Sequence, residues 1–465
     1  MIRIIAQSLL AAIFLGAPAA ASAAGPLRLK QVLDSVEGTH PELEGAEQKR
    51  EAAEGKALSA RGGFDPKVAL KGKWTPVSYY ENAQLDATIE QATPVWGASV
   101  YAGYRFGWGD YPVYKGDLRT RQYGELRAGI DIPVWNGGPI DARRAKIATT
   151  KAGIRGAKAQ VDATTLALQR EAAEAYWNWV AAGRNLAITE GLLELARARQ
   201  KALDAQVDAG AIEAIKKVDN ERLVLSREAK VVKARQKLDK AAIELSLYYR
   251  DAELRPMRPT ADQVPPEIRD PGPPTSVSLE AGINEALERR PELAGLDAQR
   301  DAADVEVRLA KNLRSPDASV QAFGAQDFGP GTIQPSAEFG VGFMLSIPIP
   351  LRKARGQLQV ARAELAGLRA KVRGTRDKIE SEVRKAHVAL VASRRAWDLA
   401  RRQAEAAATL AGAERRKFRE GASDLVVVNL RELAVASAQA SVVDAAADYH
   451  RAHADFRVAT GQSPL

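Results

Sequence analysis

Histidine and cysteine provide many of the metal ligands and nucleophiles of proteins, and this chain has few of either. It contains no cysteine and four histidines in 465 residues. His450 and His453 are three residues apart, a spacing that puts both rings on one face of a helix. No third ligand can be assigned to them, and packing between helices explains such a pair equally well. We therefore predict no metal site, no cofactor and no thiol chemistry.

Catalytic groups are equally hard to find. No spacing of serine, histidine and aspartate, or of two carboxylates, identifies a reactive centre. The stretch Gly340-Val341-Gly342 lies in a strand-like pattern and lacks the following helix that a phosphate-binding loop requires. The formal net charge is +9, but basic and acidic residues are interleaved throughout, so we expect no nucleic-acid binding. The chain is predicted not to be an enzyme.

Two glycines interrupt otherwise continuous helical sequence. Residues 140–255 and 351–463 contain no proline, which is excluded from helix interiors. Each stretch predicts a helix of about 70 residues, a turn at Gly210 or Gly421, and a returning helix of about 35 to 40 residues. The predicted hairpins occupy about 139–250 and about 351–460. Their returning helices carry apolar residues every seven positions, which is typical of a coiled-coil seam: Val224, Val231, Leu238 and Leu245 in one, and Val428, Val435, Val442, Tyr449 and Phe456 in the other.

Alternating sequence precedes each hairpin. Val68, Leu70 and Trp74 alternate with lysines, and Phe339, Val341 and Phe343 alternate with small residues. Period-two alternation is typical of strands between lipid and a wet lumen. We predict one strand pair at about 65–135 and another at about 316–349, four strands in all. The tryptophans around them are candidates for an aromatic girdle at the membrane surface: Trp74, Trp96, Trp108 and Trp135.

The chain reads as two copies of one unit. Pro41-Glu42-Leu43 matches Pro291-Glu292-Leu293 at an offset of 250, and Ile132-Pro133 matches Ile347-Pro348 at an offset of 215, so the first copy has a longer loop. The predicted fold class is mixed and mainly α, with a helix, strand, strand, long helix, helix unit repeated. The predicted segments are a first repeat at 24–255, a proline-rich linker at 256–276 and a second repeat at 277–465.

The N-terminus predicts export. Arg3, an apolar run over 4–15 and Ala21-Ser22-Ala23 are typical of a secretory signal peptide, here residues 1–23. No later run reaches about 18 apolar residues, so we expect no membrane-spanning helix and a membrane crossing made of strands.

The order of these motifs resembles that of the outer-membrane efflux proteins, the TolC-like outer membrane factors. The resemblance covers nearly the whole mature chain. It rests on the duplication, the helix starts His40-Pro41-Glu42-Leu43 and Arg290-Pro291-Glu292-Leu293, the two Ile-Pro segments, and the helix turn Phe418-Arg419-Glu420-Gly421-Ala422-Ser423-Asp424-Leu425.

The resemblance implies a passive exit duct in the cell outer membrane that extends into the periplasm. It implies a homotrimer whose twelve-stranded β-barrel, set in outer membrane lipid, continues into a long α-helical barrel. The implied partners are a periplasmic adaptor and an inner-membrane pump or ABC exporter, in a tripartite efflux or type I secretion system. Tip, gate and adaptor-docking residues would then be Gly210, Ala211, Glu213, Phe418, Glu420, Gly421 and Asp424.

Three points stay open. Val427 and Leu430 stand where the family's type member carries pore aspartates, so Asp424, Glu420, Asp208 and Glu213 are either a different selectivity ring or charges that solvate the turns. The helices alone also fit a structural or adhesive coiled-coil surface protein without a channel. The cargo, whether drugs, metal ions or polypeptides, is not determined.

Overall fold

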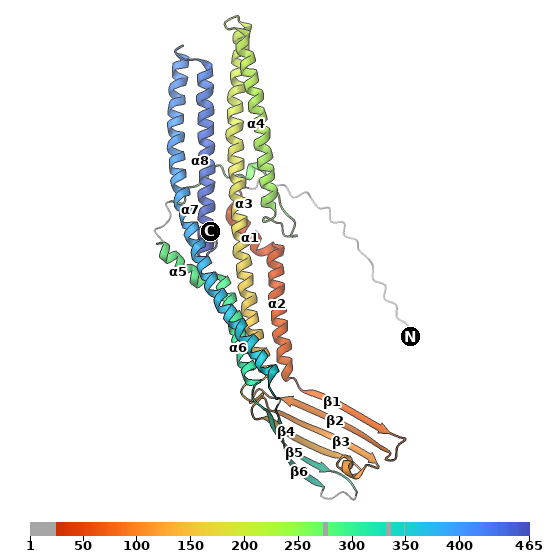
Figure 1. Ribbon diagram of the computed structural model, residues 1–465. Coiled ribbons are helices and arrows are strands. Elements are labelled where there is room, and N and C mark those ends of the chain that lie inside the picture. Colours follow the sequence, from red (N-terminus) through yellow and green to blue (C-terminus); the bar gives the residue numbers. More distant parts are fainter. Residues whose placement is uncertain (1–24, 273–277, 332–335, 348) are drawn as a thin grey trace, which may run out of the picture.

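The computed structural model describes residues 25–272, 278–331, 336–347 and 349–465. The expected signal peptide, 1–23, lies outside them. Long helices form a column, and a curved sheet lies at one end of it (Figure 1). The helices are α1 (Leu29–Thr39), α2 (Pro41–Arg61), α3 (Ala142–Asp208), α4 (Ala214–Ser246), α5 (Leu279–Arg289), α6 (Pro291–Asn312), α7 (Arg352–Arg419) and α8 (Leu425–Ala459), with short 3-10 turns η1 (Gly62–Phe64), η2 (Val113–Leu118) and η3 (Ala261–Gln263).

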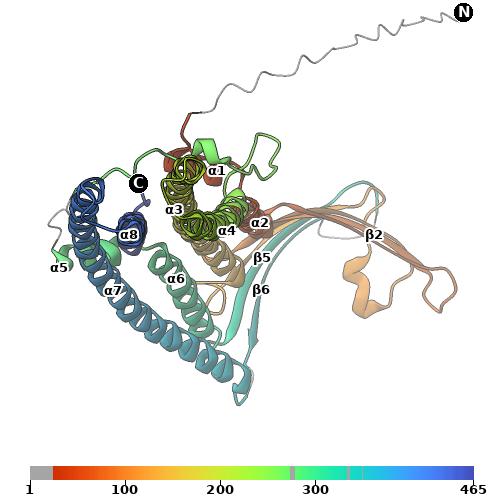
Figure 2. The same ribbon diagram turned by 90° about the horizontal axis from the view of Figure 1, so that it is seen from above.

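The two stretches without proline form helical hairpins. Helix α3 has 67 residues and α4 has 33, while α7 has 68 and α8 has 35. At 1.5 Å per residue, α3 and α7 are each about 100 Å long. Viewed from above, the four helices stand side by side in the order α7, α8, α3, α4 (Figure 2).

Both hairpin turns depend on a glycine in the left-handed region. Gly210 has φ 69° and Gly421 has φ 76°. In each turn the next residue donates its amide to a carbonyl five residues back, Ala211 to Gln206 and Ala422 to Lys417, at 2.8 Å. This is the Schellman arrangement, which satisfies the last carbonyls of a helix and favours glycine.

Side-chain caps mark the starts of α2, α3 and α5. His40 precedes the proline that opens α2, and its ring Nδ1 accepts from the Glu42 amide at 3.3 Å. Asp141 accepts from the Arg144 amide at 2.8 Å at the start of α3, and Ser278 accepts from the Ala281 amide at 3.2 Å at the start of α5. These bonds satisfy amides that have no partner inside the helix.

The heptad positions lie in the seams of the hairpins. Leu238, Leu245, Val428 and Tyr449 are buried, and none of the other heptad residues is fully exposed. The core is thickest near mid-column, where Trp179 is completely buried. The linker crosses the column at this level. A Cβ on Gly183 of α3 would lie 2.5 Å from the Val264 side chain of the linker, so a glycine is needed where α3 passes under the linker.

The sheet has six strands, so the expected count of four is wrong. The strands β1 (Lys67–Thr75), β2 (Asn82–Ala92), β3 (Ser99–Gly109), β4 (Glu125–Pro133), β5 (Asp317–Asp327) and β6 (Ala337–Ser346) pair antiparallel in chain order. The segment at 65–135 therefore holds four strands rather than two. The longer loop of the first repeat is a β-hairpin made of β2 and β3. The alternation of apolar and polar residues did not predict it, because glycines and charges interrupt the pattern in these two strands.

Candidate functional site

One face of the sheet is apolar, exposed and free of charge. The register puts Val68, Ile89, Ala102, Ala128 and Phe339 in one row across the strands. Alternate residues along each strand continue this face, and none of its strand residues is Asp, Glu, Lys or Arg. Large side chains on it have no partner within the described chain: Val68 is 79% exposed and Phe343 is 87% exposed. Water is a poor solvent for such a surface, whereas lipid is a good one.

The four predicted girdle tryptophans lie at two levels of the sheet. Trp74 and Trp108 both neighbour Ala83 on the apolar face, near the end away from the helices. Trp96, in the β2–β3 turn, and Trp135, just after β4, lie at the end next to the helices and are each 50% exposed. At about 3.3 Å per residue, the strand between the levels is roughly 30 Å long, which is the length of a tilted strand that crosses a bilayer.

The opposite face carries the charges of the strands. Lys71, Asp86, Arg105, Glu125 and Asp327 form one row across five strands. Arg105 pairs with Asp86 at 3.3 Å and with Glu125 at 3.6 Å. The lysines of β1 and Arg127 of β4 lie on this same face.

The segment between β3 and β4 lies over this polar face. The Gly107 amide donates to the Thr120 hydroxyl at 3.0 Å, and a Cβ on Gly107 would lie 2.1 Å from the Leu118 carbonyl oxygen. This cover accounts for the burial of Asp86, Arg105 and Glu125 on the polar face.

The predicted tip residues lie at the far end of the column from the sheet. Gly210 and Gly421 make the two turns, and Phe418 is 41% exposed beside the second turn. Asp424 caps α8, where its Oδ1 accepts from the Val426 amide at 3.1 Å. Glu213 occupies the equivalent cap of α4 without a side-chain bond, and Glu420 ends α7. Capping accounts for Asp424 without any pore role.

A buried carboxylate below the tip joins the two hairpins. Glu432 of α8 is 3% exposed and pairs with Arg199 of α3 at 2.8 Å. Arg227 of α4 lies 3.7 Å from it and Arg415 of α7 lies 3.5 Å from it. Burial lowers the pKa of Arg227, whose guanidinium also donates to the Leu192 carbonyl at 2.6 Å. One carboxylate thus contacts arginines from all three other long helices.

Sequence reasoning missed Glu432, although a signal was present. Arg431 and Glu432 are the only charged residues in 425–443. Among the described helices, α8 alone is long and apolar enough to cross a membrane by length and composition, contrary to the expectation of no such helix. Glu432 is held in ion pairs with the other helices of the column. In this protein, an acidic residue within an apolar helix therefore indicates a contact between helices.

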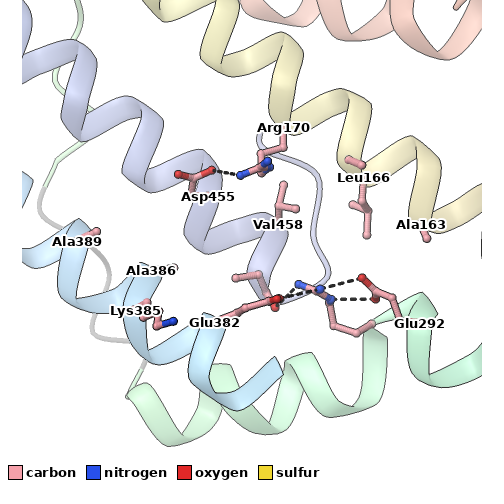
Figure 3. A pocket seen from close by; sticks show the side chains of 13 residues that line it. Ala163, Leu166, Arg170, Glu292, Glu382, Lys385, Ala386, Ala389, Asp455 and Val458 are labelled. Atoms are coloured by element: carbon pink, nitrogen blue, oxygen red, sulfur yellow. Dashed lines mark hydrogen bonds and ion pairs between the residues drawn. The ribbon is translucent and has the colours of Figure 1, made fainter. Parts of the chain in front are cut away.

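The hairpins also meet at a charged groove near their feet. Figure 3 shows Arg170 of α3 facing Asp455 of α8, and a second cluster beside them. In that cluster Arg290 pairs with Glu292 at 2.8 Å and with Glu382 at 3.0 Å. The groove holds about 520 Å³. Most of its charges are paired, which favours a joint between helices over a ligand site.

The paired histidines serve packing. The His450 ring stacks on Trp177 with ring centroids 3.9 Å apart, and its Nε2 lies 2.9 Å from the Arg269 carbonyl oxygen of the linker. Burial lowers the pKa of His450 to about 4, so the ring is neutral at pH 7. Within the described ranges no group of three or more His, Cys, Asp or Glu side chains could hold a metal ion.

Known proteins share this combination of sheet and helical column. The family model of the outer membrane efflux proteins matches residues 32–249 and 282–462. The chain belongs to this family. A comparison with proteins of curated description finds no match.

Solved structures of channels have a similar fold. The Campylobacter jejuni CmeC outer membrane channel has a TM-score of 0.64 and 14% identity, covering 93% of this chain and 85% of that one. The open-state MtrE channel of Neisseria gonorrhoeae has a TM-score of 0.64 and 16% identity, covering 94% and 89%. VceC of Vibrio cholerae, an outer membrane protein, has a TM-score of 0.63 and 17% identity, covering 94% and 97%. At such identities the likeness establishes the fold of this efflux protein.

Proposed function

We propose that this chain is the passive exit duct of a tripartite efflux or type I secretion system. It crosses the outer membrane as a strand barrel and extends into the periplasm as a helical tunnel, after export by the signal peptide expected at 1–23. The observation that carries the proposal is the uncharged, exposed face of the sheet joined to helices about 100 Å long.

Apolar stripes on the outer helices support a ring of copies. Val218, Leu225 and Val232 are exposed on α4, seven residues apart, on the side away from α3. Val388, Leu399 and Leu410 are exposed on α7, on the side away from its own bundle. These helices stand at opposite ends of the row of four (Figure 2). Contact of α4 in one copy with α7 in the next is head-to-tail, and repetition closes a ring.

The free edges of the sheet fit the same ring. Strands β1 and β6 are its two edges, and in an all-antiparallel sheet of six they run in opposite directions. Pairing of β6 in one copy with β1 in the next therefore continues the antiparallel pattern. Open strand edges are not tolerated in lipid, so the edges need partners. A homotrimer is the assembly we propose.

The partners proposed are a periplasmic adaptor and an inner-membrane pump or ABC exporter. The tip would receive the adaptor, because it is the part of the column farthest from the membrane. Glu432 and its arginines would hold the two hairpins together there, so that the tip is closed until the ion pairs separate.

Planar-bilayer conductance of the detergent-extracted protein, with its oligomer mass, tests the proposal. We expect a trimer that gives small, flickering channels. A water-soluble, non-conducting oligomer would contradict it and would favour the structural coiled-coil protein instead.

A further inference from the structure

Two of the six strands have no counterpart in the second half of the chain. Strands β5 and β6 are consecutive, whereas β2 and β3 separate β1 from β4. We propose that this inserted hairpin makes the membrane exit an eighteen-stranded barrel, three copies of six strands, that admits wider cargo than a twelve-stranded exit. Barrel diameter grows roughly in proportion to strand number, so the exit is about half again as wide. The inference rests on the trimeric duct proposed above.

The inserted hairpin is bonded into the sheet on both sides. Strand β2 pairs with β1 from Asn82↔Thr75 to Glu90↔Lys67, and β3 pairs with β4 from Ser99↔Asp131 to Arg105↔Glu125. It is therefore part of the wall.

Ion pairs tie the insert to the strand that follows it. Asp86 of β2 is 3.0 Å from Arg127 of β4, and Arg105 of β3 pairs with Glu125 of β4. Asp86, Arg105 and Glu125 are each no more than 9% exposed. Separating the hairpin from β4 would break both of these ion pairs and leave the buried Glu125 without Arg105, which is costly for a buried charge, while Asp86 and Arg105 would still pair with each other.

The insert also presents the right surface to lipid. Ile89 of β2 and Val100 of β3 are 47% and 40% exposed on the apolar face, in register with the duplicated strands. If the hairpin were instead folded into the lumen, this apolar face would be exposed to water. An insert of two strands leaves the relative direction of β1 and β6 unchanged, so ring closure is the same with it or without it.

The register shows that the hairpin can be deleted while β1 and β4 remain able to pair. Lys71 faces Asp86, Asp86 faces Arg105, and Arg105 faces Glu125. Deleting two strands brings Lys71 opposite Glu125, again a pair of opposite charges. Deletion of residues 82–118 therefore leaves β1 and β4 antiparallel with their polar faces aligned, joined by the remaining loop residues.

Polymer exclusion from the exit side measures the width. Poly(ethylene glycol) of graded size is added on that side, and the largest polymer that alters the single-channel conductance is recorded. We expect the intact protein to admit polymers about one and a half times the diameter admitted by the deletion variant. A second variant lacks only loop residues 112–118, which controls for loss of the loop, and it should admit polymers at least as large as the intact protein does.

Cysteine pairs test the strand order in the full-length chain, which has no cysteine of its own. Ala102 and Ala128 are directly opposite on β3 and β4, so A102C/A128C should form an intramolecular disulfide. The pair L70C/L126C would form one only if β1 were the neighbour of β4.

Each outcome decides between distinct statements. Equal polymer limits for the intact and hairpin-deleted proteins, or a disulfide in L70C/L126C in place of A102C/A128C, would overturn the eighteen-stranded exit and leave a twelve-stranded duct in place. A protein that neither assembles nor conducts would overturn the duct and the wide exit together.

Discussion

At the scale of single residues, Glu432 matters because it is one buried anion among three arginines. Glu432→Ala removes the anion and leaves Arg227, itself 3% exposed, without its carboxylate. Loss of one partner of a buried pair costs about 3–5 kcal/mol, and the remaining arginines repel one another. We expect a lower melting temperature and larger, longer channel openings in bilayers.

The control for that variant is Glu405→Ala, which removes an exposed carboxylate that has no ion pair among the described residues. It should leave both melting and conductance unchanged. If Glu432→Ala and the intact protein had equal conductance, the ion pairs of Glu432 would have no role in gating.

Asp424 tests the hypothesis of an acidic selectivity ring. Its side chain caps α8, and asparagine caps a helix about as well while carrying no charge. We expect Asp424→Asn to keep both stability and ion selectivity, and Asp424→Ala to lose about 1 kcal/mol of stability with selectivity unchanged. Bi-ionic reversal potentials and thermal melting provide the two measurements. A loss of cation preference in both variants would instead put Asp424 in the pore.

At the scale of elements, a charge introduced on β6 should reduce membrane insertion on one face of the strand and not on the other. Val341, midway along the strand, belongs to the apolar face and is 65% exposed. Val341→Lys should reduce insertion into outer membrane vesicles, since a lysine facing lipid at mid-depth costs about 2–4 kcal/mol. Met344→Lys, on the polar face of the same strand, should insert normally. Equal insertion of both variants would contradict a lipid-facing role for the apolar face.

At the scale of the whole molecule, the stripe on α4 is expected to bind the next copy. Leu225→Glu with Val232→Glu puts two charges into that contact and should shift the oligomer toward monomer in analytical ultracentrifugation. Ser226→Glu with Lys237→Glu changes exposed residues about a third of a turn away and should leave the oligomer intact. If both double variants assembled alike, the stripe would not be the interface between copies.

Local patterns determined most of the elements. The absence of proline, together with Gly210 and Gly421, was sufficient to predict two long helical hairpins, because backbone rules for proline and left-handed glycine act within a few residues. Strict alternation in β1 and β6 predicted the two faces of the sheet for the same reason. The resemblance to efflux proteins then came from the order of motifs along the chain.

Contacts between distant segments were decided only by the tertiary structure. Strands β2 and β3 were identified only by their pairing with β1 and β4. The alternation of apolar and polar residues in each is weak, and the neighbouring strands stabilise them. The partners of Glu432 lie 17 to 233 positions away in the chain, so no spacing could reveal them. The burial of Asp86 and Arg105 depends on a loop folding back over the sheet, and that packing is settled in three dimensions.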